Sequence, residues 1–307
     1  MLAYSLRRLG GAIPTLFVVM TVSFFLMRLA PGGPFDRERM LAPAIEASIK
    51  KAYNLDQPLI VQYGIYLSKA LKGDLGPSFK YQDYSVVELI ESGFPVSFEI
   101  GITAIILAVI VGGGFGIFAA LRQNSGLDHA VMATAMIGIT VPNFVMAPLM
   151  TLILGVYLRL LPVGGFGGGS LRNLILPTVA LALPPVAYIA RLTRASMIEV
   201  LRSNYIRTAR AKGLPGRLVV GRHGLRAAFL PVVSYLGPAI AGIITGSVVI
   251  ETIFGIPGIG RYFVQGALNR DYTLVMGVVI FYGSLIILLN LLVDLAYGVL
   301  DPKIRYD

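Results

Sequence analysis

Residues 100–121 read IGITAIILAVIVGGGFGIFAAL, a stretch with no charged residue and no histidine. As a helix rising about 1.5 Å per residue, a run of this length crosses the roughly 30 Å hydrocarbon core of a bilayer. Cutting the chain at every Lys, Arg, Asp, Glu and His leaves six such runs of at least 18 residues, at 9–27, 100–121, 130–158, 173–190, 227–250 and 272–293. We therefore expect an all-α polytopic membrane protein with six transmembrane helices. Run 9–27 exceeds the apolar core of a cleaved signal, about 7 to 15 residues, so it is counted as a span.

The composition agrees with a membrane protein and argues against a soluble enzyme. Of the 307 residues, 56% are hydrophobic and 14% charged, about half the charged fraction of soluble domains, and the mean hydropathy is +0.76. The net charge of +10 could suggest nucleic acid, but the basic residues lie between apolar runs rather than in one patch. With no cysteine and only His129 and His223, the chain offers no disulfide and no metal-ligand set.

The basic residues also predict the orientation, because cytoplasmic loops retain Lys and Arg during insertion. An even number of spans puts both termini on one side. That side then holds 14 basic residues: Arg7, Arg8, Arg122, nine between Arg191 and Arg226, Lys303 and Arg305. Its acids are Asp128, Glu199, Asp301 and Asp307, so it carries the whole net charge of +10. We expect cytoplasmic N- and C-termini.

Several segments carry glycine and proline signals. Small residues let helices approach closely in lipid, and proline bends them, so we expect a compact bundle of bent helices from Gly112, Gly113, Gly114, Gly116, Pro142, Pro148, Pro184 and Pro185. GGFGGG at 164–169 lacks the Lys-Ser or Lys-Thr ending of a phosphate loop and is interpreted as a turn. The apolar stretch 59–67 is too short to span, so it is expected on the membrane surface or against the bundle.

The long basic loop at 191–226 reads RLTRASMIEVLRSNYIRTARAKGLPGRLVVGRHGLR. Met197, Leu201 and Tyr205 recur every four residues, which predicts one amphipathic helix that ends at Gly213. On a continuous helix Ile206 emerges on the charged face. Residues 217–226 are expected to start a second basic helix leading into the fifth span. Such a loop either rests on anionic lipid or docks a soluble partner.

A resemblance favours docking. YIRTARAKGLPGRLVVGRHGLRAAFLP at 205–231 resembles the cytoplasmic coupling loop of ABC importer membrane subunits, in the peptide and nickel branch. The start of the chain through GGPF at 32–35, GDLGPSF at 73–79, FGIPGIGRYFVQGALNRDYTLVMG at 254–277 and DPKIR at 301–305 resemble the same branch. The combination is most similar to the B-type permease subunits of bacterial oligopeptide importers.

This resemblance implies the type I ABC importer permease fold in the bacterial inner membrane. It implies a homologous second permease, two cytoplasmic ATPases that bind ATP and Mg, an external peptide-binding protein and a peptide substrate, with no cofactor, metal or catalytic residue in this chain. It also divides the chain into 1–95, a first helix with a long external segment; 96–300, a five-helix core with the coupling loop 191–226; and 301–307, a cytoplasmic tail. Closure of the ATPases would move the coupling helix and switch the bundle between outward-open and inward-open states.

The coupling helix implied by the resemblance covers Ser203, Asn204, Tyr205, Ile206, Arg207, Thr208, Ala209, Arg210, Ala211 and Lys212, ending at Gly213. Arg207-Thr208-Ala209 replaces the Glu-Ala-Ala of the wider superfamily, so no ion pair of that glutamate is expected here. Substrate-binding residues are not assigned.

The sequence also allows other functions. A dipeptide or nickel importer of the same branch would share these motifs. An ion-driven secondary transporter needs intramembrane ionisable groups, whereas Glu99, Glu251 and Asp294 lie near predicted span ends and are interpreted as interfacial or hydrogen-bonded carboxylates. An intramembrane enzyme needs a catalytic constellation within the spans, and both histidines lie in or beside loops.

Overall fold

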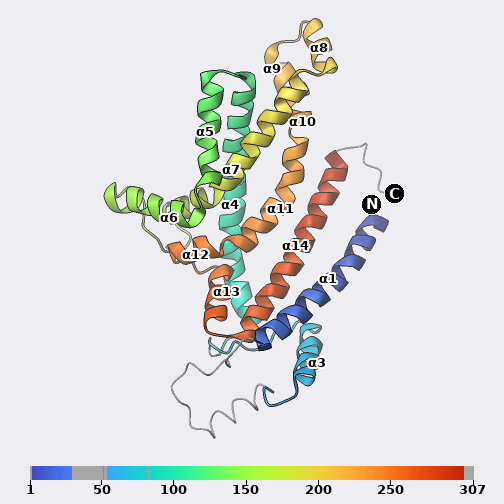
Figure 1. The fold of residues 1–307 in the computed structure, drawn as a ribbon, viewed down its shortest axis with the longest axis vertical. Helices are drawn as coiled ribbons and strands as arrows, with labels where there is room; N and C mark the ends of the chain where they lie inside the picture. The colour runs from blue at the N-terminus through green and yellow to red at the C-terminus, as the bar shows by residue number, and fades with distance from the viewer. Residues whose placement is uncertain (1, 30–50, 52–53, 82, 301–307) are drawn as a thin grey trace. The chain divides into compact units, whose positions relative to one another are not determined.

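The computed structural model describes residues 2–29, 51, 54–81 and 83–300, and in those ranges its regular secondary structure is helical apart from one isolated bridge between Pro77 and Ser85 (Figure 1). The tail 301–307 and the charges counted there lie outside the described residues, as do the side chains of Arg7, Arg8 and Asp294. The chain forms two compact units. One consists mainly of 97–256 with 286–307, and the other of 6–96 with 257–285.

The larger unit is built on three long helices in close contact. They are α4 (Val86–Leu121) from Ser97 onward, α5 (Gly126–Thr140) and α7 (Leu171–Leu201). A Cβ on Gly116 would lie 2.5 Å from the Thr193 Cβ, and one on Gly138 would lie 2.2 Å from the Leu183 carbonyl oxygen. The predicted role of small residues in close helix packing is confirmed at Gly116, and Gly138 allows the same close approach between α5 and α7.

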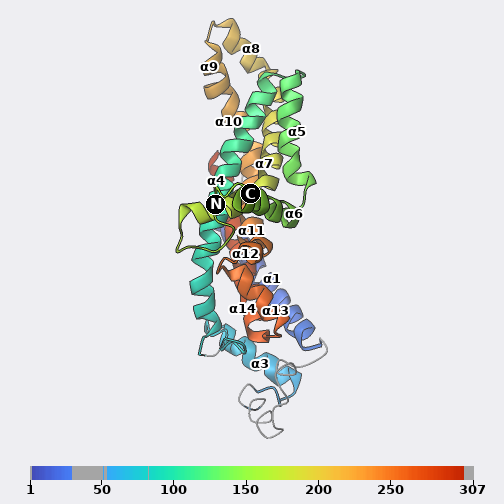
Figure 2. The same ribbon diagram turned by 90° about the vertical axis from the view of Figure 1, so that its left-hand side faces the viewer.

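The run 130–158 does not form one straight span, as a simple count of uncharged residues implies. After α5 the chain turns by 106° into α6 (Asn143–Met150), which continues as a π-helix, η1 (Thr151–Tyr157). Figure 2 shows α6 turned away from the axis of α5. Pro142 stands immediately before α6 with φ −59° and ψ 143°, so proline chemistry causes the bend. The Pro184 and Pro185 pair, in contrast, lies within α7 without ending it.

The glycine-rich segment after η1 forms a turn, as predicted. Gly165, Gly167, Gly168 and Gly169 have positive φ, where a side chain would be strained. The Asn173 amide donates to the carbonyls of Gly164 and Gly165, each at 3.1 Å, and so closes the turn against the start of α7.

The remaining helices of the larger unit lie within the basic loop 191–226 or follow it. They are α8 (Asn204–Ala211), α9 (Gly216–Leu218), the π-helix η2 (Val219–Gly224), α10 (Leu225–Ala228), α11 (Leu230–Gly246) and α12 (Val248–Phe254). The segments Gly216–Ala228 and Leu230–Thr245 meet at 47°. Within the described ranges four helices are long and apolar enough to span a membrane, and six spans result if each bent pair is one.

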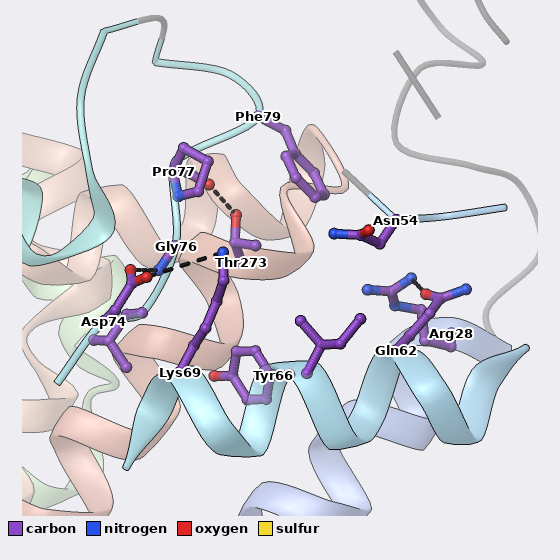
Figure 3. Close-up of a pocket in the computed structure, with 12 residues that line it drawn as sticks. Arg28, Asn54, Gln62, Tyr66, Lys69, Asp74, Gly76, Pro77, Phe79 and Thr273 are labelled. Atoms are coloured by element: carbon purple, nitrogen blue, oxygen red, sulfur yellow. Dashed lines mark hydrogen bonds and ion pairs between the residues drawn. The ribbon is translucent and has the colours of Figure 1, made fainter. Parts of the chain in front are cut away.

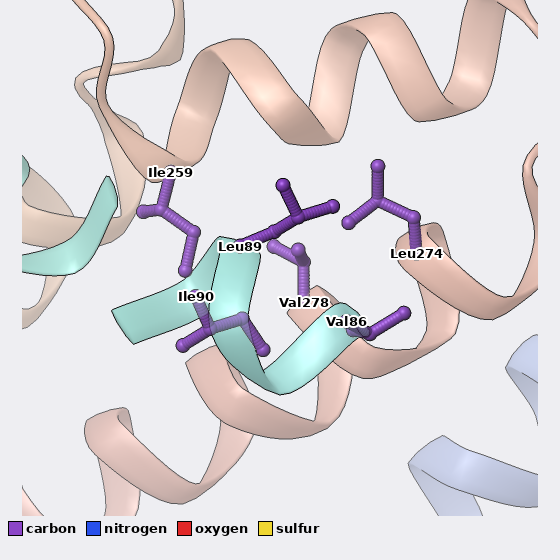
Figure 4. Close-up of a cluster of buried hydrophobic side chains, with 6 residues drawn as sticks. All are labelled: Val86, Leu89, Ile90, Ile259, Leu274 and Val278. Carbon is purple, nitrogen blue, oxygen red and sulfur yellow. The ribbon is translucent and has the colours of Figure 1, made fainter. Parts of the chain in front are cut away.

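The smaller unit contains α1 (Leu2–Leu29, from Leu6 onward), α3 (Leu59–Ala70), α13 (Ile259–Leu268), the start of α4 and the start of α14 (Tyr272–Leu300). Its core joins Val86, Leu89 and Ile90 of α4 to Ile259, Leu274 and Val278 (Figure 4). The stretch 59–67 is helical and packs against α1, with the Phe24 and Tyr63 ring centroids 5.2 Å apart. The prediction that it lies against the bundle is confirmed for this contact.

Candidate coupling site

The predicted coupling helix is a separate two-turn element, α8, with well-defined ends. Ser203 precedes it in an extended conformation with φ −67° and ψ 156°, and its carbonyl accepts from the Arg207 N–H at 3.1 Å. At the other end Gly213 has φ +77° and its N–H donates to Arg210 O, while the Leu214 N–H donates to Ala209 O. These paired bonds are the Schellman motif, which requires a left-handed residue after the helix. Gly213 therefore ends the helix as the sequence predicts.

The continuous helix expected from Met197 to Ala209 is wrong, and the error changes which face Ile206 occupies. Helix α7 ends at Leu201, and the extended Ser203 resets the rotation before α8 begins. Ile206 is fully buried rather than exposed on the charged face, and it packs with Ala209, Val219 and Val200. The expectation that Ile206 lies on the charged face assumed an uninterrupted helix, and that assumption fails at Ser203.

Burial divides the predicted coupling residues into two groups. Ile206 and Ala209 point inward, while the rest of α8 is exposed, including Arg207, Arg210 and the 47% exposed Tyr205. Lys212 and Gly213 at its end are also exposed. The helix thus presents a cationic outer face and is held by a two-residue apolar inner face. Figure 1 shows α8 and α9 beyond the end of α7.

A continuous apolar path links α8 to the long helices. Val200 packs both against the Ile206 cluster and against a second cluster formed by Ala120, Met197 and Ala228. That second cluster joins α4, α7 and α10. Val200 therefore connects α8 through packed side chains to a cluster that three elements of the bundle share.

An ion pair braces the same end of the bundle. The Arg194 guanidinium on α7 donates from Nε and Nη2 to the two oxygens of Asp128, both at 2.7 Å. Asp128, in the first turn of α5, also accepts from the Asn124 N–H at 2.9 Å and is fully buried. The Arg202 guanidinium donates to Gln123 at 3.1 Å. The turn between α4 and α5 is therefore tied to α7 directly before α8.

Sequence reasoning missed this ion pair, since Asp128 and Arg194 were counted only as loop charges. The sequence did contain one signal. Asp128 lies just before one predicted span and Arg194 just beyond another, so the two charges lie at the same membrane face. Pairing there lowers the cost of burying them. Their separation of 66 residues gave no indication of contact.

The three carboxylates near span ends have different surroundings. Glu251 is fully buried and accepts from Ser97 at 2.6 Å and from Ser247. Its interpretation as a hydrogen-bonded carboxylate is confirmed. Glu99 is exposed, while the side chain of Asp294 lies outside the described part. Among the described residues no cluster of His, Cys, Asp or Glu could hold a metal ion.

Residues 112–306 match the family described as binding-protein-dependent transport system inner membrane component, and residues 1–101 match the N-terminal family of the same components. The chain belongs to this family. It is therefore a multi-pass protein of the bacterial inner membrane, and the recognition made from sequence is confirmed.

Relatives of this membrane component extend over its full length. The oligopeptide transport system permease protein OppB of Escherichia coli K12 is 57% identical over 306 residues, covering 100% of both chains. The dipeptide transport system permease protein DppB of Bacillus subtilis is 47% identical, covering 99% of this chain and 98% of that protein. A solved structure of the MetNI methionine ABC transporter in an inward-facing conformation matches with a TM-score of 0.57 at 17% identity, covering 70% of this chain and 97% of that chain. The last likeness supports the type I importer permease fold.

Proposed function

We propose that this chain is the permease subunit of an ATP-driven oligopeptide uptake system. The observation that carries the proposal is the 57% identity over the whole length to an oligopeptide permease. The dipeptide permease of B. subtilis, at 47%, supports a dipeptide importer as the second candidate. Peptide uptake is expected for both, and they differ in the length of the peptide.

In this proposal the chain supplies one half of the translocation pathway and performs no covalent chemistry. A homologous second permease supplies the other half, two cytoplasmic ATPases bind ATP and Mg, and an external binding protein delivers the peptide. Residues 1–95 form the first helix and external segment, 96–300 the permease core, and 301–307 a cytoplasmic tail. Both termini and the loop 191–226 face the cytoplasm, as the distribution of basic residues indicates.

Helix α8 is the proposed contact with an ATPase. Its exposed Arg207, Arg210 and Lys212 would meet an anionic cleft, because charge complementarity orients a docking helix. Ile206 and Ala209 hold it to the permease, and Val200 carries its displacement to α7 and the bundle. ATP-driven closure would then switch the permease between outward-open and inward-open states, an interface-driven rigid-body motion.

The decisive experiment reverses a charge on α8 and compares it with a reversal in the same loop. Arg210→Glu should abolish peptide-stimulated ATP hydrolysis in the reconstituted transporter, because like charges across an interface cost several kcal/mol. Arg217→Glu is the matched control, since Arg217 is exposed in the loop but lies outside α8. The control should retain stimulated hydrolysis.

The same two variants, Arg210→Glu and Arg217→Glu, distinguish docking to an ATPase from anchoring on lipid. If the loop only rests on anionic lipid, both reversals should weaken activity to a similar degree, because surface attraction counts each cation about equally. Equal losses would reject the coupling role of α8 while leaving peptide transport intact as a proposal. Uptake of labelled peptides of two to five residues then distinguishes the oligopeptide from the dipeptide candidate.

A further inference from the structure

A cavity of about 140 Å³ lies within the smaller unit, between the end of α1, one face of α3 and the segment before α4 (Figure 3). Its polar lining includes Arg28 of α1, Gln62, Tyr66 and Lys69 of α3, and Asp74. The peptide-transport mechanism proposed above assigns no role to these residues.

Arg28 is a half-buried cation that lacks a bonded carboxylate among the described residues. One of its terminal nitrogens donates to the Gln62 side-chain oxygen, and its guanidinium carbon lies 5.0 Å from the Phe24 ring centroid and 5.2 Å from that of Tyr272. Its Nε is buried without a hydrogen-bond partner. Neutral partners and ring faces leave the charge uncompensated, and a buried unpaired donor is costly.

The neutral side chain of Gln62 cannot compensate the charge of Arg28. Its amide nitrogen already donates to the carbonyls of Gln57 at 2.7 Å and Leu55 at 3.3 Å, which fixes its oxygen toward Arg28. The side chain therefore acts as a brace that orients the guanidinium at the cavity.

Tyr66 supplies a second unsatisfied donor to the same cavity. Its hydroxyl oxygen is buried and has no hydrogen-bond partner in the part of the chain that the structure describes. Burial raises the pKa of Tyr66 well above its ordinary value, so the hydroxyl keeps its proton at physiological pH. Two of the residues that line the cavity therefore carry an unsatisfied donor, and one of these donors is charged.

The other charges in the lining compensate each other. The Lys69 ammonium lies 3.9 Å from an Asp74 oxygen, and both side chains are about half exposed. Among the described lining residues, the charge that remains is the positive charge of Arg28. A ligand with one negative charge would neutralise Arg28, and at least two acceptor oxygens would bond the unsatisfied donors of Arg28 and Tyr66.

The position of the cavity identifies the source of that ligand. Arg28 lies in the last turn of α1, whose apolar span Gly10–Leu29 exposes Phe17, Val22 and Leu26. The neighbouring α3 exposes Leu59, Ile60 and Val61 at its start, as a helix lying in the membrane interface does. A span end beside an interfacial helix lies at the depth of the lipid headgroups.

We propose that this cavity binds the phosphate of a membrane phospholipid headgroup. The phosphodiester carries one negative charge and two non-bridging oxygens, which pair with the Arg28 guanidinium, while the Tyr66 hydroxyl donates to another oxygen of the same headgroup (Figure 3). The bound lipid joins α1 to α3 and holds the external segment at the membrane surface.

The test measures lipid retention by the full chain, purified in detergent with its co-purifying subunits, by native mass spectrometry. Dioleoyl phosphatidylglycerol is titrated against dioleoylglycerol, which has the same acyl chains without the phosphate. We expect Arg28→Gln and Tyr66→Phe each to weaken phosphatidylglycerol retention by about ten- to a hundredfold, as expected for loss of a charge-assisted hydrogen bond. Arg159→Gln removes an exposed cation outside the cavity and should retain the lipid.

Tyr66→Phe removes only one oxygen, so it tests the site even if Arg28→Gln fails to fold. Equal retention by wild type, Tyr66→Phe and Arg159→Gln would overturn the proposal, as would equal retention of the lipid lacking phosphate. Displacement of phosphatidylglycerol by equimolar inorganic phosphate, or by a tripeptide carboxylate, would assign the cavity to a soluble anion and also overturn it. None of these outcomes depends on peptide transport.

Discussion

At the scale of single residues, Gly213 has the most specific requirement in the coupling loop. A Cβ at this position would meet no atom within 4 Å, so a substitution here acts through the backbone and not through a clash. Gly213→Ala should destabilise the end of α8 by about 1 kcal/mol, because φ +77° is left-handed. Limited proteolysis of the loop should accelerate and stimulated ATP hydrolysis should fall.

Gly216→Ala is the matched control for that change. Gly216 lies in the same loop, also has open space where a Cβ would lie, and does not have positive φ. If both alanine variants are cleaved and hydrolyse ATP equally, the Schellman turn does not control the position of α8.

A second residue-scale prediction concerns the pair Asp128–Arg194. Asp128→Asn should lower the free energy of unfolding by about 2 kcal/mol, less than for a fully buried pair because 27% of the Arg194 side chain is exposed. Glu199→Gln, an exposed carboxylate on α7, should change it by less than about 0.5 kcal/mol. Denaturant unfolding in detergent measures both. An Asp128→Asn cost that persists undiminished in an Arg194→Gln background would show that the pair is not coupled.

At the scale of elements, the sequence predicts the existence of helices better than their interruptions. Uncharged length was sufficient to find α1, α4 and α14, and Gly213 located the end of α8. The bend at Pro142 was predicted from the proline, but its size of 106° and the break at Ser203 were not, because serine and proline are also tolerated inside helices and the bundle decides between the alternatives. The burial of Ile206 depends on that break, so it could not be predicted either.

The inner face of α8 provides the element-scale test. Ile206→Ala should remove the packing against Val219 and Val200 and cost about 2–4 kcal/mol locally. Amide hydrogen exchange should then rise throughout Asn204–Ala211 while α7 stays protected. Tyr205→Ala, on the exposed face, should leave exchange unchanged. Increased exchange in the Tyr205 variant alone would reverse the assignment of the two faces.

At the scale of the whole molecule, fold class and family membership followed from sequence because both depend on features distributed along the entire chain. The six apolar runs, and the motifs distributed over the whole chain, can be identified even where individual helix boundaries are predicted wrongly. The cavity at Arg28 could not be predicted, because its lining comes from α1, α3, the segment before α4 and the start of α14, and no motif relates them.

The orientation of the chain is the remaining molecular prediction, and the absence of cysteine makes it directly testable. Ala211→Cys, exposed at the end of α8, should be inaccessible to a membrane-impermeant maleimide in intact cells and label after permeabilisation. Ser170→Cys, exposed before α7, should label in intact cells, because an uncharged run separates the two positions. Both sites must be labelled in detergent for the comparison to hold. The reverse pattern would place α8 on the external face, where no cytoplasmic ATPase could reach it, and coupling through α8 would be excluded.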